Sequence, residues 1–181
     1  MKRIRIAVAI LAATAVVAIT PDIAAAQCTA GGAPASCGVP GSASMTAGRV
    51  VQLQMSAGST PLTAPTPADF DAGFNSTSGP TLTVSANSAW TLHIRAAAPS
   101  WTGTDTSPGA PARTNKPAGD LQWATSSGGP FAALTASDAS LVAGSAAAGD
   151  ATTLYFHTRY DWTLDTPGNY SLSIVLTLTA P

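Results

Sequence analysis

Polar and apolar residues alternate most regularly at the C-terminal end of the chain, over residues 170–179. One face of an extended segment here carries five apolar side chains: Tyr170, Leu172, Ile174, Leu176 and Leu178. Serine and threonine occupy most of the opposite face. A period of two is typical of a β-strand that buries one face. The pattern therefore predicts a terminal strand over residues 170–179 with its apolar face in the core.

Further alternating runs predict strands at residues 49–55, 81–86, 90–96, 121–125 and 152–164. Only three residues, including Asn87, separate the second run from the third, and asparagine tolerates turn conformations, so we expect these two strands to pair as a hairpin. The last of these runs leads through Pro167-Gly168, which suits the centre of a type II turn. We expect it to lie antiparallel to the terminal strand.

Two long segments rich in proline and glycine, residues 60–79 and 99–119, interrupt these runs. Proline has no N–H group to donate, so the first segment is predicted to be a loop and not a central strand. A loop as long as the second is usually functional or mobile. Together the patterns predict an all-β fold, a single immunoglobulin-like antiparallel β-sandwich of about seven strands with long loops.

The N-terminal residues predict export. A basic start, Met1 to Arg5, precedes an apolar stretch at residues 6–19 and the small residues Ala24-Ala25-Ala26. The apolar stretch is shorter than the about 20 residues that cross a bilayer, so residues 1–26 are predicted to be a cleaved signal peptide. No later run is long enough to span a membrane, so we expect a mature chain in the periplasm, at the cell surface or outside the cell.

The mature chain divides into an arm at residues 27–48 and a β-sandwich domain at residues 49–181. The arm holds the two cysteines of the chain, Cys28 and Cys37, and an exported pair at this spacing predicts a disulfide. Five basic residues stand against eight aspartates after residue 26, a net charge of −3. This balance predicts no nucleic-acid partner.

Catalytic motifs are missing from the sequence. The two histidines, His93 and His157, stand opposite the apolar face of their strands, without a nearby partner that would make either a general base. There is no Gly-x-Ser-x-Gly elbow, phosphate-binding loop or HExxH zinc motif. Asp69 and Asp71 lack the spacing of an EF-hand and are interpreted as turn residues. We therefore expect neither enzymatic activity nor a metal or cofactor.

The second long segment holds the candidate binding residues. Trp101 could stack on a sugar ring or a partner surface, and Arg113 and Lys116 add a basic pair to the same loop. An exposed loop of this kind predicts a structural or adhesive protein that binds an envelope polymer, a glycan or a surface protein. The sequence does not indicate an oligomeric state.

Two Trp-x-Leu triplets, Trp90-Thr91-Leu92 and Trp162-Thr163-Leu164, resemble the paired signature of the WxL surface proteins of Gram-positive bacteria. In that family the domain associates non-covalently with the cell wall. The resemblance implies a surface-displayed β-domain with the same kind of partner.

The C-terminal end resembles that of chaperone–usher pilus subunits, whose last strand alternates and begins near a glycine fourteenth from the end, the place of Gly168 here. Asp165, Gly168 and Tyr170 are also similar to the tyrosine corner of immunoglobulin-type domains, in which the tyrosine opens strand F. These likenesses imply that strand G is missing and is donated by another chain. The sequence leaves open whether the sandwich is complete or is a pilus-like subunit of this kind.

Overall fold

The computed structural model describes residues 31–33, 36–38, 41–106 and 111–181, and it separates the chain into Met1–Thr46 and Ala47–Pro181. The described residues before 47 contain no helix or strand. The predicted signal peptide lies outside the described residues, and so does Cys28 of the predicted disulfide. No helix within the described ranges is long and apolar enough to cross a membrane.

The second unit is mostly β-structure, and every strand pairing is antiparallel. Its helices are α1 (Pro67–Ala72) and the 3-10 helix η1 (Ala118–Asp120). Its strands are β1 (Val51–Met55), β2 (Phe74–Ala86), β3 (Trp90–Ala96), β4 (Thr102–Asp105), β5 (Leu121–Ala124), β6 (Ala132–Ala133), β7 (Ala139–Gly144), β8 (Ala147–Arg159), β9 (Gly168–Ser171) and β10 (Ile174–Thr179). The described residues thus hold ten strands where about seven were expected, in part because β4 forms within a predicted loop and the terminal segment divides into β9 and β10.

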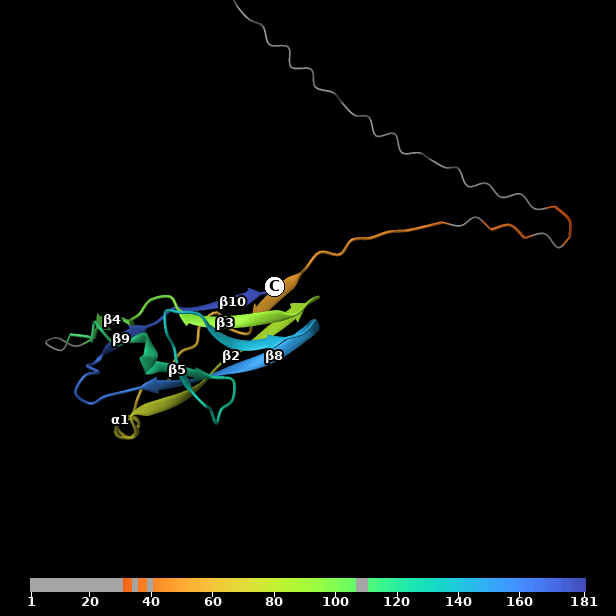
Figure 1. The fold of residues 1–181 in the computed structure, drawn as a ribbon. Helices are drawn as coiled ribbons and strands as arrows, with labels where there is room; N and C mark the ends of the chain where they lie inside the picture. Colours follow the sequence, from red (N-terminus) through yellow and green to blue (C-terminus); the bar gives the residue numbers. More distant parts are fainter. Residues whose placement is uncertain (1–30, 34–35, 39–40, 107–110) are drawn as a thin grey trace, which may run out of the picture. The chain divides into compact units, whose positions relative to one another are not determined.

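The strands form three open sheets (Figure 1). The first has the order β1-β2-β8-β5-β6, the second β10-β3-β7, and β4 pairs with β9 in the third. Inward side chains of the first two sheets meet in one core that includes Leu82 and Leu154 from the first sheet and Leu92 and Ile94 from the second. The alternating patterns are the reason, because each strand offers one apolar face to this core.

The predicted hairpin between residues 81–86 and 90–96 is wrong. β2 pairs with β1 and β8, whereas β3 pairs with β10 and β7, so the two segments lie in different sheets. Their apolar faces pack toward each other from opposite sides of the core. Asn87 makes no hairpin turn with positive φ, and its side chain instead accepts a hydrogen bond from the Val50 N–H group and donates one to the Gly48 carbonyl.

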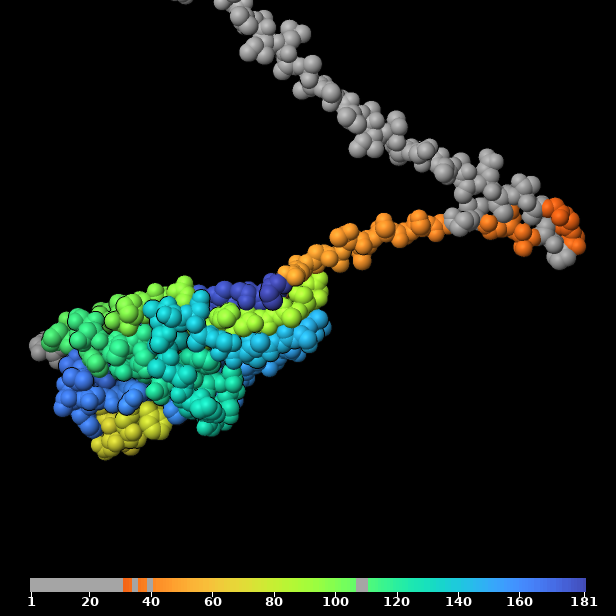
Figure 2. Space-filling view, in the orientation of Figure 1, coloured from red at the N-terminus to blue at the C-terminus, as the bar shows by residue number. Residues whose placement is uncertain are grey.

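The predicted terminal strand is divided between two sheets. β9 pairs with β4, the chain leaves regular structure at Leu172 and Ser173, and β10 then pairs with β3. β8 is not a neighbour of either segment. Figure 2 shows the dark-blue C-terminal residues at the surface beside the yellow-green residues of β3.

The Pro167-Gly168 sequence does not form the predicted type II turn, because Gly168 does not have the positive φ that such a turn needs. Glycine is required there for a different reason. A Cβ atom at this position would lie 2.7 Å from the Cβ atom of Ala112, so β9 could not approach the preceding loop as closely.

The first proline-rich segment is also more regular than predicted. The Thr66 hydroxyl accepts the Asp69 N–H group and the Asp69 carboxylate accepts the Thr66 N–H group, a capping box that starts α1, and Gly73 ends the helix with φ of 79°. β2 then begins at Phe74. Pro80 is tolerated within this strand because it sits where the pairing with β8 shifts register, between Ser78 and Thr81.

β8 ends at Arg159, five residues earlier than the alternation predicts. The Asp161 carboxylate accepts the N–H groups of Thr163 and Leu164 and so forms a turn. The alternation of residues 152–164 places Trp162 and Leu164 on the same face as Leu154 and Phe156, in the core, but they are 59% and 51% exposed in this turn.

Candidate functional site

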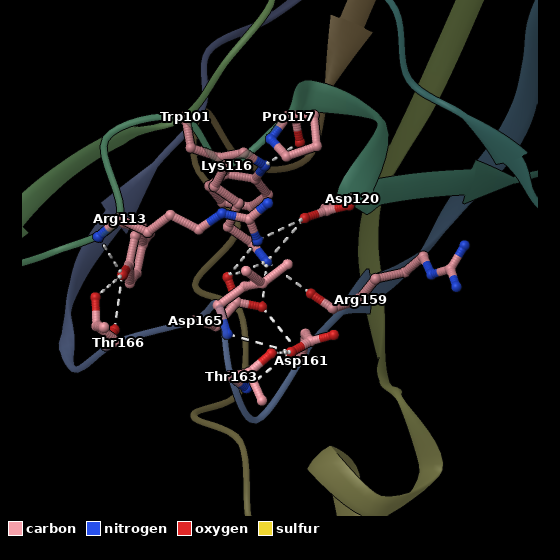
Figure 3. A network of polar contacts seen from close by, with 12 residues as sticks. Trp101, Arg113, Lys116, Pro117, Asp120, Arg159, Asp161, Thr163, Asp165 and Thr166 are labelled. Atoms are coloured by element: carbon pink, nitrogen blue, oxygen red, sulfur yellow. Dashed lines mark hydrogen bonds and ion pairs between the residues drawn. The ribbon is translucent and has the colours of Figure 1, made fainter.

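The three predicted binding residues gather at one end of the second unit, where the loop before η1 meets the turn between β8 and β9 (Figure 3). They are not the exposed side chains that their position in a long loop predicts. Trp101 is 5% exposed and Lys116 is 2% exposed, and the Arg113 side chain is 15% exposed. Their part in binding a ligand stays a prediction, but as they stand they offer little surface to a partner.

Lys116 is the centre of a buried ionic cluster. Its ammonium group donates to both carboxylate oxygens of Asp165, at 2.9 and 3.0 Å, and to the Arg159 carbonyl at 2.7 Å. It also lies 3.2 Å from Asp120 and 5.4 Å from the centroid of the Tyr160 ring. Removing such a charge from water is tolerated only when it is paired and hydrogen-bonded, and this one has all of its donors satisfied.

Arg113 completes the charge balance of the cluster. Its guanidinium lies 3.0 Å from Asp165 and 3.6 Å from Asp120, so two cations face two carboxylates. The second oxygen of Asp165 also accepts the Asp161 N–H group. The cluster therefore holds the loop before η1 against the turn before β9, a structural role that needs no ligand.

Tyr170 fastens the same two segments. Its hydroxyl donates to the Thr166 carbonyl, four residues upstream, at 2.7 Å and accepts the Arg113 N–H group at 2.9 Å. The indole N–H of Trp101 donates to the Pro117 carbonyl at 3.1 Å, which fixes the other side of the loop. A hydroxyl bound to upstream backbone is the feature that defines a tyrosine corner.

A groove lies beside Trp101 and Tyr170, between the edge strands β1 and β10 of the two larger sheets. Its cavity volume is about 790 Å³. β1 supplies Leu53 and Met55 to the wall, the segment after β1 supplies residues 57–62, and β10 supplies Ile174 and Leu176. Leu154 and Phe156 of β8 form the floor, so the groove reaches the core.

Both strands at the mouth of the groove are edge strands. Within the described ranges β10 pairs only with β3, and β1 pairs only with β2. Because one edge has no neighbouring strand among the described residues, the apolar face of the terminal segment is not fully covered. Five of its side chains are only partly buried: Tyr170, Leu172, Ile174, Leu176 and Leu178. The outer edge of β10 leaves its backbone N–H and C=O groups available for another strand.

His157, one of the two histidines of the chain, lies on the outer face of β8. The His157 ring stacks between Phe74, at 4.6 Å between centroids, and Phe131, at 3.4 Å. Burial by these rings lowers the pKa of His157 below its usual 6.5, which favours the neutral form. No group of three or more possible metal ligands occurs in the part of the chain that the structure describes.

No protein-family model matches this sequence, and no curated protein matches it significantly. The likenesses to WxL proteins and to pilus subunits therefore rest on the quoted residues alone. Of these, the first Trp-x-Leu triplet lies in β3 with Trp90 3% exposed, and the second lies in the exposed turn after β8. The two triplets thus occupy different environments.

Proposed function

We propose that this chain is an immunoglobulin-like β-sandwich that lacks one strand and accepts it from a second copy of the chain, so that copies join head to tail. The function is structural, as in the pilus subunits that the C-terminal sequence resembles, and residues 1–26 direct the chain out of the cytoplasm.

The order of the strands supports this assignment. An immunoglobulin domain places strands A, B, E and D in one sheet and C, F and G in the other. Here β1, β2, β8 and β5 follow the first order, and β3 and β10 stand as C and F. Tyr170 precedes β10 as the corner tyrosine precedes strand F. The position of strand G, beyond the outer edge of β10, has no strand among the described residues.

The single observation that carries the proposal is the unpaired edge of β10 beside an apolar groove that reaches the core. A strand added there would bond its backbone to β10 and place alternate side chains into the groove, the β-augmentation mode of recognition. It would also cover the partly buried side chains of β10. Burial of apolar surface favours this at about 25 cal/mol per Å².

The segment before β1 supplies a suitable donor. Ala43, Met45 and Ala47 alternate with Ser44 and Thr46. This segment holds no helix or strand, and Met45 is 90% exposed, the largest exposed fraction among the large apolar residues described. Because the donor segment and the acceptor groove are different surfaces of the chain, they make a heterologous contact, which continues into a chain of subunits and does not close as a symmetric dimer does.

The test is the mass of residues 27–181 after refolding from denaturant at high protein concentration. Light scattering should detect a ladder of oligomers that grows with concentration. The Met45→Asp variant should remain a monomer, because a charge cannot enter the apolar groove. Ser44→Asp adds the same charge to the opposite face of the donor segment and should leave the ladder largely intact.

A chain that stays monomeric at every concentration contradicts the proposal. So does a monomer in which the β10 amides that point away from β3 are protected from hydrogen exchange, because its own arm would then fill the groove. The adhesive function that the long loop predicts has less support, since Trp101, Arg113 and Lys116 are largely buried.

A further inference from the structure

A second cavity, of about 630 Å³, lies beside the ionic cluster, between residues 62–65, the end of β8 and the turn before β9. Its size is within the range of small-molecule sites, about 300–1,000 Å³. Aromatic rings contribute much of its wall: Phe70, Trp101, Tyr160, Trp162 and Tyr170. Such a wall is expected of a site that binds a ligand with an apolar face.

Trp162 forms an exposed aromatic platform at this cavity. Its ring stacks on Phe70, with centroids 4.5 Å apart and an angle of 27° between the planes, and its indole N–H donates to the Asp71 carboxylate at 3.0 Å. Phe70 in turn meets the Tyr160 ring at 5.4 Å. The indole is therefore held in one orientation while 59% of the residue stays exposed, so binding would cost little conformational entropy.

Thr158 gives the cavity a polar group that the described residues leave without a close partner. It faces inward from β8 with Leu154 and Phe156 and is 4% exposed, and its side chain lines the cavity. The Thr158 hydroxyl interacts with the Tyr160 side chain, but it has no hydrogen bond of normal length to any described residue. A buried hydroxyl without such a bond carries a desolvation cost, which a hydroxyl group of a ligand could offset.

The charges around the cavity restrict the class of ligand. Lys116 and Asp165 are in the wall, but they neutralise each other at 2.9 Å. Beside the platform, Asp71 contacts Trp162, and Asp161 directly precedes it. These carboxylates repel an anionic ligand and can accept hydrogen bonds from hydroxyl groups.

We propose that this cavity binds a neutral saccharide of two or more sugar units, with one ring stacked on Trp162 and a hydroxyl group bound to Thr158. A pyranose ring has an apolar C–H face and a rim of hydroxyl groups, which matches an aromatic platform with carboxylates beside it. The proposal does not rest on strand acceptance, since Trp162 and Thr158 line this cavity and not the groove beside β10.

The first test is a ¹H–¹⁵N NMR titration of residues 27–181 with maltose, cellobiose, lactose and N,N′-diacetylchitobiose. At least one of them should shift the Trp162 indole signal together with backbone signals of residues 158–170. If none of the four sugars shifts these signals, the proposal is overturned. Binding of tetramethylammonium without any of the sugars also overturns it, since the rings would then form a cation site.

Two variants then distinguish a binding role from a structural one. Trp162→Ala should weaken binding of the active disaccharide about tenfold or more, as expected for an aromatic contact residue. Thr158→Val keeps the shape of the side chain, and it should leave the melting temperature unchanged or raise it while weakening binding about tenfold. Phe131→Ala, on the outer face of the first sheet, is the control and should bind as the unchanged protein does. Equal affinity in Thr158→Val and the unchanged protein would exclude the assigned hydroxyl contact.

Discussion

Strands β3 and β10 lie side by side in one sheet and carry the same alternation of polar and apolar residues, yet they are buried to different extents. Leu92 and Ile94 of β3 are 0% exposed, whereas Leu176 and Leu178 of β10 stay partly exposed. β3 has a neighbouring strand on each side, and β10 has one. A period of two therefore determines which face of a strand is apolar, while the number of neighbours determines how completely that face is covered.

The largest expected effect comes from truncating one leucine in each strand. Leu92→Ala should lower the free energy of unfolding by about 3–4 kcal/mol, because it leaves a cavity in a closed core. Leu176→Ala should cost only about 1–2 kcal/mol, because its site is already open at the groove. Urea denaturation of both variants measures the difference.

The same pair of variants sharpens the comparison when the groove is filled. With a peptide of residues 41–50 bound, the cost of Leu176→Ala should rise toward that of Leu92→Ala. Equal costs without any peptide would mean that β10 is as well covered as β3, and the open-edge interpretation would fail.

A second, slightly smaller effect concerns what holds the terminal segment in place where neighbouring strands do not. Asp165 precedes β9 and its side chain is 6% exposed between Lys116 and Arg113. Asp165→Asn should cost about 3 kcal/mol, because two buried cations then share a single carboxylate.

The exposed ion pair of Arg95 and Asp138, 3.4 Å apart, is the matched control for this substitution. Their side chains are 37% and 55% exposed, so Asp138→Asn should cost less than about 1 kcal/mol. Losses of equal size, measured by thermal denaturation, would show that the buried cluster does not anchor the segment.

The smallest expected effect is a dependence on pH that arises in the other sheet. Burial lowers the pKa of His157, so the unfolded chain takes up a proton first as the pH falls. The contribution of neutral His157 to the free energy of unfolding should therefore be fully present above about pH 6.5. It should decrease as the pH falls from there toward the lower pKa of the folded state. His157→Phe should flatten this dependence in denaturant titrations between about pH 8 and about pH 5.

The change in pH should not alter the difference in stability cost between truncations in β3 and in β10. Asp69 and Asp161 do not titrate in this window, because hydrogen bonds from Thr66 and Thr163 respectively lower their pKa values. The difference between Leu92→Ala and Leu176→Ala should thus be the same at both ends of the range. If the difference in unfolding free energy between these two variants changed with pH, the two sheets would be coupled in a way that the stacking of His157 does not explain.

The sequence predicts the positions of most strands but not their partners. The alternation at residues 49–55 and 90–96 marks β1 and β3 to within two residues, whereas the run at residues 170–179 marks β10 but begins four residues too early, within β9. Leu82 and Trp90, on either side of a short connection, fit a hairpin within one sheet or a crossing between two facing sheets equally well. The choice depends on β8 and β10, which arrive much later in the chain, so no local pattern contains it.

The candidate site was predictable only in part, again because its residues come from segments that lie far apart in the chain. The sequence places Trp101, Arg113 and Lys116 in one loop, but the carboxylate that pairs with Lys116 stands 49 residues later. The tyrosine-corner likeness was the available signal, since it pointed to Asp165 and Tyr170. Trp162 continued the alternation of β8, and only the hydrogen bonds of Asp161 show that the strand has ended before it.

The ionic cluster has a practical consequence for labelling. Lys116 is the only lysine after residue 26, and it is 2% exposed. If the signal peptide is removed, amine-reactive dyes should find one accessible group on the folded protein, the new α-amino group at the start of the arm. A second label would appear only on molecules in which the cluster has opened, so the ratio of singly to doubly labelled chains would report local unfolding directly.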